Sequence, residues 1–151
     1  MNQPVAVVTG ATGGIGRWIA LGLAKAGYHT ILVGRDEARG QAARDWIAHQ
    51  ASSTSTDFML ADLASLAETR ALGQRLLAAH PKIAILTANA GIFSAKRETT
   101  PEGHDRVLAV NHLSPFVLIE TLLPALIAAA PSRIIPRAAG EHDGLGPDAR
   151  L

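Results

Sequence analysis

Short apolar segments alternate with longer amphipathic segments along most of the chain. Each short segment holds four or five mostly apolar residues, many of them β-branched, which is typical of a buried strand. These segments are residues 5–8, 30–34, 57–60, 83–87 and 132–135. The stretches between them carry apolar residues at helical spacing. Strict alternation of strands and helices predicts an α/β fold built on a parallel sheet.

The first expected strand runs directly into a glycine-rich turn, and a helix follows. The turn reads Thr9-Gly10-x-x-x-Gly14-x-Gly16, and the helix has apolar positions at Ile15, Ile19, Leu23 and Ala26, with Gly27 as a stop. The first N–H groups of a helix lack intrahelical partners and lie at the positive end of its dipole. Glycines let a pyrophosphate approach that backbone. The arrangement predicts nucleotide binding by Gly10, Thr12, Gly13, Gly14, Ile15 and Gly16.

Capping signals mark the starts of the later helices. Asp36 is expected to cap the second helix. Ser65 and Glu68 form a capping box for a third helix that runs to about residue 80. Thr100, followed by Pro101, is expected to begin a long helix that ends near residue 130.

The end of the second strand bears on the choice of cofactor. An acidic residue there would accept a hydrogen bond from the ribose 2′-hydroxyl of NAD. The chain has Gly34 at that place, and Arg35 follows. A guanidinium suits a phosphate group, although an arginine at a strand end can also simply be solvated. The missing acid favours NADP over NAD.

Composition and charge narrow the classes of function. The 151 residues are 48% hydrophobic and carry a net charge of +1 without a basic stripe, which argues against a nucleic-acid partner. Cysteine is absent and the six histidines show no metal-ligand spacing, so no metal site is expected. No signal peptide precedes the first strand, and the apolar run 116–130 contains Glu120 and Pro124. We therefore expect no membrane span and a cytoplasmic location.

The form T-G-x-x-x-G-x-G, together with Asn89-Ala90-Gly91 after the fourth strand, resembles the short-chain dehydrogenase/reductase family. The sequence of residues 91–93 and 110–113 is similar to that of the retinol-dehydrogenase-like members of the family. The resemblance covers residues 5–135 and implies a Rossmann-like, doubly wound sheet with strand order 3-2-1-4-5. It implies hydride transfer between NADP and an unknown small alcohol or carbonyl compound. Ala84 and Ala88 depart from the usual family pattern, which indicates a divergent member.

The resemblance also assigns roles to residues beyond the glycine turn. It implies that Asp62, with Leu63, contacts the adenine, and that Asn89, Ala90 and Gly91 line the cofactor pocket. From position alone, Asp62 could equally be a loop acid ahead of a helix.

Asn111 matches the asparagine of the family's catalytic Asn-Ser-Tyr-Lys set, whose backbone carbonyl holds a water molecule. In a regular helix that carbonyl would accept from residue 115, but Pro115 has no N–H to donate. We therefore expect a kink at Asn111. An ordinary proline kink beside a polar surface residue is the alternative.

The resemblance stops near residue 135. The family continues into a catalytic serine and a Tyr-x-x-x-Lys pair, but here Pro136 follows and the one tyrosine is Tyr28. We expect residues 1–135 to form a partial NAD(P)-binding domain, truncated after about the fifth strand. Residues 136–151 are expected to be an irregular tail, as produced by a shifted reading frame or an engineered terminus.

Two hypotheses of function follow from this reading. The first is an NADP-dependent oxidoreductase whose present chain binds the cofactor but is inactive alone. The second is a non-catalytic nucleotide-binding or interaction module. An exposed fifth strand beside the apolar run 116–130 also predicts self-association.

Overall fold

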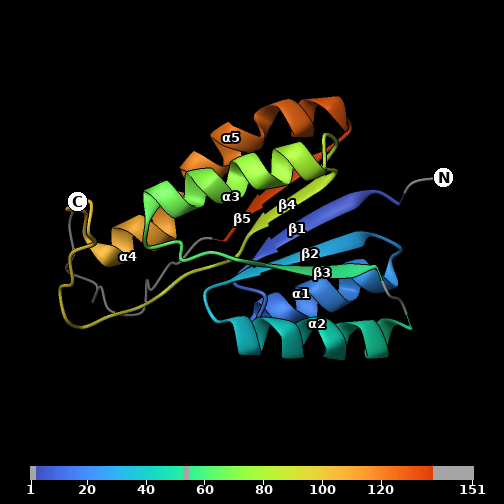
Figure 1. The fold of residues 1–151 in the computed structure, drawn as a ribbon, viewed down its shortest axis with the longest axis horizontal. Helices are drawn as coiled ribbons and strands as arrows, with labels where there is room; N and C mark the ends of the chain where they lie inside the picture. Colours follow the sequence, from blue (N-terminus) through green and yellow to red (C-terminus); the bar gives the residue numbers. More distant parts are fainter. Residues whose placement is uncertain (1–2, 53–54, 138–151) are drawn as a thin grey trace, which may run out of the picture.

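The computed structural model describes residues 3–52 and 55–137 and contains one five-stranded parallel sheet. Its strands all run in the same direction (Figure 1), in the order β3-β2-β1-β4-β5. The strands are β1 (Val5–Thr9), β2 (His29–Gly34), β3 (Thr56–Leu60), β4 (Ile85–Ala88) and β5 (Arg133–Pro136). The strand order expected from the sequence is confirmed, with the fourth strand starting two residues later than predicted.

Helices cover both faces of the sheet, so the fold is doubly wound (Figure 1). On one face lie α1 (Gly14–Lys25) and α2 (Glu37–Ala51), and on the other lie α3 (Leu66–Ala79) and α5 (Ser114–Ala128). Before α5 come the short helix α4 (Arg106–Leu108) and a π-helical turn, η1 (Ala109–Leu113). This architecture confirms the predicted Rossmann-like class.

Alternate residues of the central strands enter two separate cores. Val7 of β1 lies in the core beneath α3 and α5, while its neighbour Val8 lies in the core beneath α1 and α2. Ile31 and Leu32 of β2 divide in the same way. Because both faces are covered, the middle of each strand is a continuous apolar run rather than an alternation of apolar and polar residues.

The face that α1 buries differs from the one expected. Ile15 is 60% exposed, and the buried positions are Gly16, Ala20, Leu21 and Ala24. Gly16, Ala20 and Ala24 recur every four residues, so small side chains face the strands. Ile19 and Leu23, which were also expected to be buried, are only partly buried and pack beside this contact.

Two predicted helix caps are confirmed and one is wrong. The side chains of Asp36 and Ser65 accept the N–H groups of Arg39 (2.9 Å) and Glu68 (3.2 Å). Thr100 begins no helix: its hydroxyl accepts from the N–H of His104 (3.2 Å), within a tight turn completed by a glycine at φ +86°. The helix begins at residue 106 behind Asp105, whose carboxylate accepts from Leu108 N.

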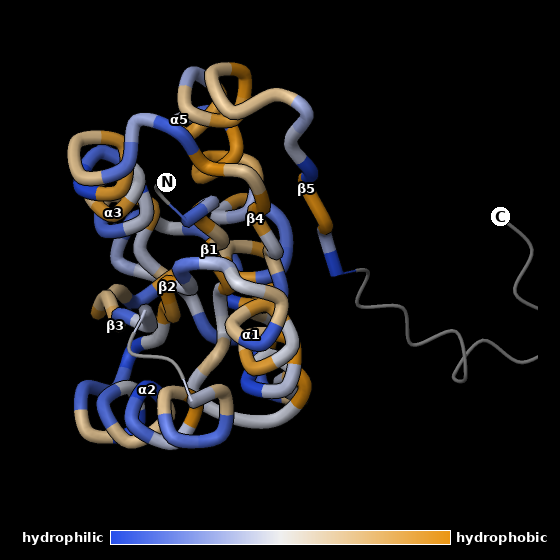
Figure 2. Tube along the Cα trace, turned by 90° about the vertical axis from the view of Figure 1, so that its right-hand side faces the viewer, coloured by the Kyte–Doolittle hydropathy of each residue, from blue (hydrophilic) through white to orange (hydrophobic). Residues whose placement is uncertain are grey.

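Strand β5 lies at an edge of the sheet (Figure 2). Its four residues are exposed. The strand includes Pro136, which pairs with Ala88, so the structured part runs one residue beyond the predicted boundary. Proline is tolerated here because an edge strand needs no N–H on its open side. The rest of the expected tail, 138–151, lies outside the described residues.

By length and composition alone, the helical stretch Arg106–Ala128 could cross a membrane. Those two properties are weak grounds, since the core helix of a soluble protein satisfies them as well. Here α5 packs against α3 and places Leu118, Leu122 and Leu126 in the core. Its other side exposes Phe116, Leu123 and Ile127.

Candidate functional site

The glycine-rich turn between β1 and α1 forms an open amino end of a helix. Gly10 and Gly14 adopt φ of +65° and +51°, a region that disfavours residues with a side chain. Gly13 precedes the helix in extended conformation, and no side chain of the described residues caps it. The first turn of α1 also lacks an acidic residue. Its positive end therefore remains available to an anion.

The turn packs directly against the segment that follows β4. The Asn89 amide Nδ2 donates to the carbonyls of Thr9 (3.1 Å) and Gly10 (3.3 Å), and Ala90 N donates to Thr9 Oγ1 (3.0 Å). A Cβ added at Gly16 would lie 2.5 Å from Asn89 Nδ2 and would collide with the Gly10 carbonyl. The absence of side chains here thus permits the helix, the turn and Asn89 to meet.

A cavity of about 200 Å³ lies at the carboxyl ends of the strands, beside this turn. Much of its wall consists of residues singled out from the sequence: Gly10, Thr12, Gly34, Arg35, Asp62, Leu63, Ala90 and Gly91. Val33, Ala61, Ile92 and Val110 complete the lining. The other predicted site residues do not line the cavity: Gly13, Gly14, Ile15, Gly16, Asn89 and Asn111. This edge is where ligands bind in open α/β sheets.

The loop after β3 is held rigidly at one side of the cavity. Asp62 accepts from Ala64 N through its carboxylate (2.9 Å), and its own N–H donates to Glu68 Oε2 (2.9 Å). The fully buried Ser114 hydroxyl donates to the Leu63 carbonyl. Glu68 therefore binds Asp62 instead of closing the predicted capping box on Ser65.

Two arginines lie near the glycine turn and the cavity. Arg35 lines the cavity directly after β2. Arg39, in the first turn of α2, places its Nη2 3.1 Å from the point where a Cβ on Gly13 would lie. Arg39 was not among the residues expected from the sequence. The signal that could have found it is its spacing of four residues from Arg35, across the predicted cap.

Asn111 lies in η1, a π-helical turn, at the place where a kink was expected. The Ser114 N–H donates to the carbonyl of Ala109, five residues earlier. The Asn111 carboxamide makes two bonds with the backbone of Ile92, accepting from its N–H (2.8 Å) and donating to its carbonyl (2.9 Å). The side chain thus anchors the loop after β4, a function that sequence reasoning did not foresee.

That loop is also tied to α3 and α4. Glu102 accepts from the Ser65 hydroxyl (2.9 Å) and from Ala67 N (3.3 Å), and these bonds lower the pKa of its carboxyl. Arg106 donates to Glu98 (2.6 Å), which raises the pKa of the guanidinium. The chain between β4 and α5 is therefore fastened at several points.

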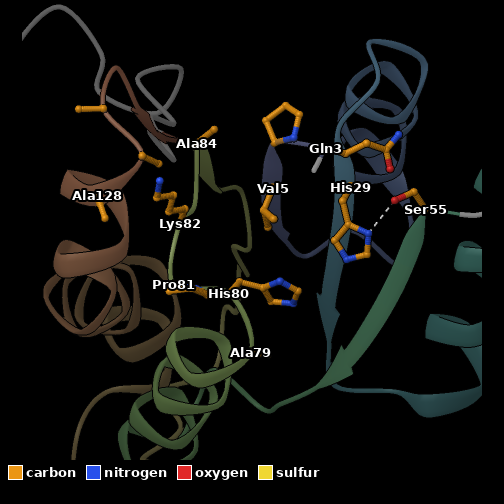
Figure 3. A pocket seen from close by; sticks show the side chains of 13 residues that line it. Gln3, Val5, His29, Ser55, Ala79, His80, Pro81, Lys82, Ala84 and Ala128 are labelled. Carbon is orange, nitrogen blue, oxygen red and sulfur yellow. Dashed lines mark hydrogen bonds between the residues drawn. The ribbon is translucent and has the colours of Figure 1, made fainter. Parts of the chain in front are cut away.

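A larger cavity, of about 840 Å³, lies at the amino ends of the strands, opposite the first cavity (Figure 3). His29 there contacts the Ser55 hydroxyl (2.7 Å) and the Asp57 carboxylate (3.1 Å). Burial and the neighbouring His29 lower the pKa of His80, while Asp57 opposes them. At this wall, His29 thus joins Ser55 and Asp57 through polar contacts. Among the described residues, no group of three metal-ligating side chains is found.

Comparisons with known proteins agree with this geometry. The sequence model of the family described as "short chain dehydrogenase" matches residues 4–139. The human "Dehydrogenase/reductase SDR family member 13" is 44% identical over 137 residues, which are 91% of this chain and 36% of that protein. Mouse "Polyprenol dehydrogenase" is 39% identical over 142 residues, covering 91% and 42%. The chain thus spans about two fifths of the length of these relatives.

Solved structures match the fold as well. A metagenomic short-chain oxidoreductase in complex with NADP superposes with a TM-score of 0.76 and 33% identity, over 87% of this chain and 59% of that one. The RhlG/NADP active-site complex of Pseudomonas aeruginosa gives a TM-score of 0.70 and 34% identity, over 87% and 52%.

Proposed function

This chain belongs to the short-chain dehydrogenase/reductase family, and we propose that it forms the NADP-binding part of a carbonyl- or alcohol-converting oxidoreductase. The uncapped amino end of α1 beside the small cavity carries this proposal. A pyrophosphate fits there because Gly14 has open space where a Cβ would be. Two similar structures are complexes with NADP, which supports the choice of cofactor.

Each wall of the cavity has a part in holding the dinucleotide. The glycine turn would bind the pyrophosphate through backbone N–H groups. Asp62 and Leu63 would border the adenine, in a loop that Ser114 keeps in place. The segment 89–91 would border the nicotinamide side, fixed by Asn89 on one side and by the bonds between Asn111 and Ile92 on the other. Bound NADPH would supply the hydride, as nicotinamide cofactors do.

Proton transfer needs groups that these 151 residues do not offer in the family pattern. The one tyrosine, Tyr28, lies between α1 and β2, at the edge of the sheet away from the cavity. We propose that Asn111 orients the loop and exposes its carbonyl for a water molecule, since Pro115 has no N–H to offer it. Cofactor binding alone would therefore be the activity of this stretch.

Replacing Arg35 with alanine is expected to weaken NADPH binding about tenfold to a hundredfold and to leave NADH binding nearly unchanged. A charge-assisted bond to the 2′-phosphate contributes about 1.5–3 kcal/mol, and NADH has no such phosphate. Calorimetry with both nucleotides measures the effect. Arg44, which pairs with Asp45 on α2, is the matched control. Equal losses of affinity for NADPH and NADH would show that Arg35 does not contact the 2′-phosphate.

We further propose that the chain self-associates through the edge formed by β5 and the exposed side of α5. Ile127 is 66% exposed and Ile135 is 46% exposed, and among the described residues β5 pairs with a strand on one side only. Light scattering at tens of micromolar, about the range where exposed edges aggregate, should detect dimers or larger species. Ile127→Lys should shift them toward monomer, whereas Leu60→Lys on the other edge strand should not. A monomeric wild-type chain would contradict this proposal.

A further inference from the structure

The methyl group of Thr12 fills the space in which a side chain at Gly34 would begin. Thr12 belongs to the glycine turn after β1, and Gly34 ends the neighbouring strand β2; the register pairs Thr9 with Val33. A Cβ added at Gly34 would lie far inside van der Waals contact with Thr12 Cγ2. Carbon atoms normally approach to about 3.5–4.0 Å. The ring of Phe58 borders the same point at 3.5 Å.

Backbone conformation does not explain the glycine at this position. Gly34 is absent from the described residues with positive φ, and it lies in a regular strand. Its carbonyl accepts from Ala61 N (2.9 Å), and β2 is paired on both sides. The strand therefore cannot slide away to admit a Cβ. Space, set by Thr12, is the reason for glycine here.

This contact bears on the choice between two cofactors. An acidic side chain at the end of the second strand would accept from the 2′-hydroxyl of NAD. The Thr12 methyl occupies the place that a Cβ at Gly34 would take, so an acid there would require Thr12 to move, and Arg35 lies next to this position. We propose that Thr12 is a specificity-determining residue: its methyl group keeps position 34 free of an acid and so reserves the site for a 2′-phosphate. This inference rests on the proposed dinucleotide binding.

A double-mutant cycle tests the inference. Gly34→Asp is made in three backgrounds: wild type, Thr12→Ser and Thr12→Val. Thr12→Ser removes only the methyl group, whereas Thr12→Val keeps a methyl group and removes the hydroxyl. We expect Gly34→Asp to gain no NADH affinity in the wild-type or Thr12→Val background. In the Thr12→Ser background it should gain at least about tenfold, because the carboxylate can then enter the site. Energy transfer from Trp18 of α1 and Trp46 of α2, whose rings are in contact, reports binding of both nucleotides.

A second readout needs no nucleotide and covers variants that bind none. Gly34→Ala should lower the thermal unfolding midpoint, and Thr12→Ser should restore most of the loss, whereas Thr12→Val should not. If the effects of the Thr12 and Gly34 substitutions are additive in both cycles, the inference is wrong, while the proposed function is unaffected. A wild-type chain that binds neither nucleotide, with strong coupling in the unfolding cycle, would overturn the proposed function and the specificity role while retaining the steric contact.

Discussion

Gly14→Asp is expected to lower the affinity for NADPH at least about a hundredfold while leaving the fold intact. The space around a Cβ at Gly14 is open, so an aspartate meets no neighbour. Its φ of +51° is one that aspartate tolerates better than most residues. A carboxylate at the first residue of α1 would also complement the helix dipole. The same charge would stand where the pyrophosphate binds, and like charges brought together cost several kcal/mol.

Gly14→Asn is the matched control, because asparagine has the same shape and the same tolerance of positive φ without the charge. We expect it to retain most of the affinity. Calorimetry gives the two dissociation constants, and thermal unfolding checks that both variants fold. If both variants lose binding equally, side-chain bulk and not charge is responsible. If Gly14→Asp binds NADPH as the wild type does, the pyrophosphate does not occupy this helix end.

The α/β class could be predicted from local patterns, and the family resemblance added the strand order. A cavity lies where several of the residues expected to bind the cofactor meet. A buried strand, a glycine turn and a helix follow one another without interruption, and each local signal points to the same fold. Asp36 and Ser65 could be read as caps because a cap depends on only a few neighbouring residues. The same local logic fails at Thr100, where Gly103 allows a turn that satisfies the hydroxyl first.

Features that depend on contacts between distant segments could not be read from the sequence. The bonds between Asn111 and Ile92 join residues 19 positions apart, and those between Asn89 and the glycine turn join residues about 80 positions apart. Spacing alone could not show that Thr12 and Gly34 touch. The buried face of α1 was misassigned for a related reason. Close approach to the strand selects small residues, whereas a hydrophobicity pattern selects large ones.

The described residues at the carboxyl ends of the strands do not include the tyrosine and lysine that the family uses to donate a proton. Ser94 lies in the loop after β4, but its hydroxyl is engaged with the backbone of Lys96 at 2.8 Å and 3.2 Å. His112 is exposed on η1. Neither residue lines the cavity. We propose that the described part of this end of the sheet binds a dinucleotide; protonating a carbonyl oxygen is a separate requirement.

The 151-residue chain is accordingly expected to bind NADPH and to show no NADPH-dependent carbonyl reduction above buffer. A positioned general acid contributes about 10²–10⁴-fold to such a reaction. The segment that follows Ile135 reads Pro136-Arg137-Ala138-Ala139, without the family's serine, and no Tyr-x-x-x-Lys pair occurs in the 151 residues. The measurement is NADPH oxidation with a panel of aldehydes, ketones and retinal-like compounds, with Gly14→Asp as the control expected to bind NADPH at least about a hundredfold more weakly. Turnover that follows the protein through purification and disappears in that variant would contradict the prediction. It would mean that another residue donates the proton, and His112→Ala and Ser94→Ala would then identify it by loss of rate at unchanged NADPH affinity.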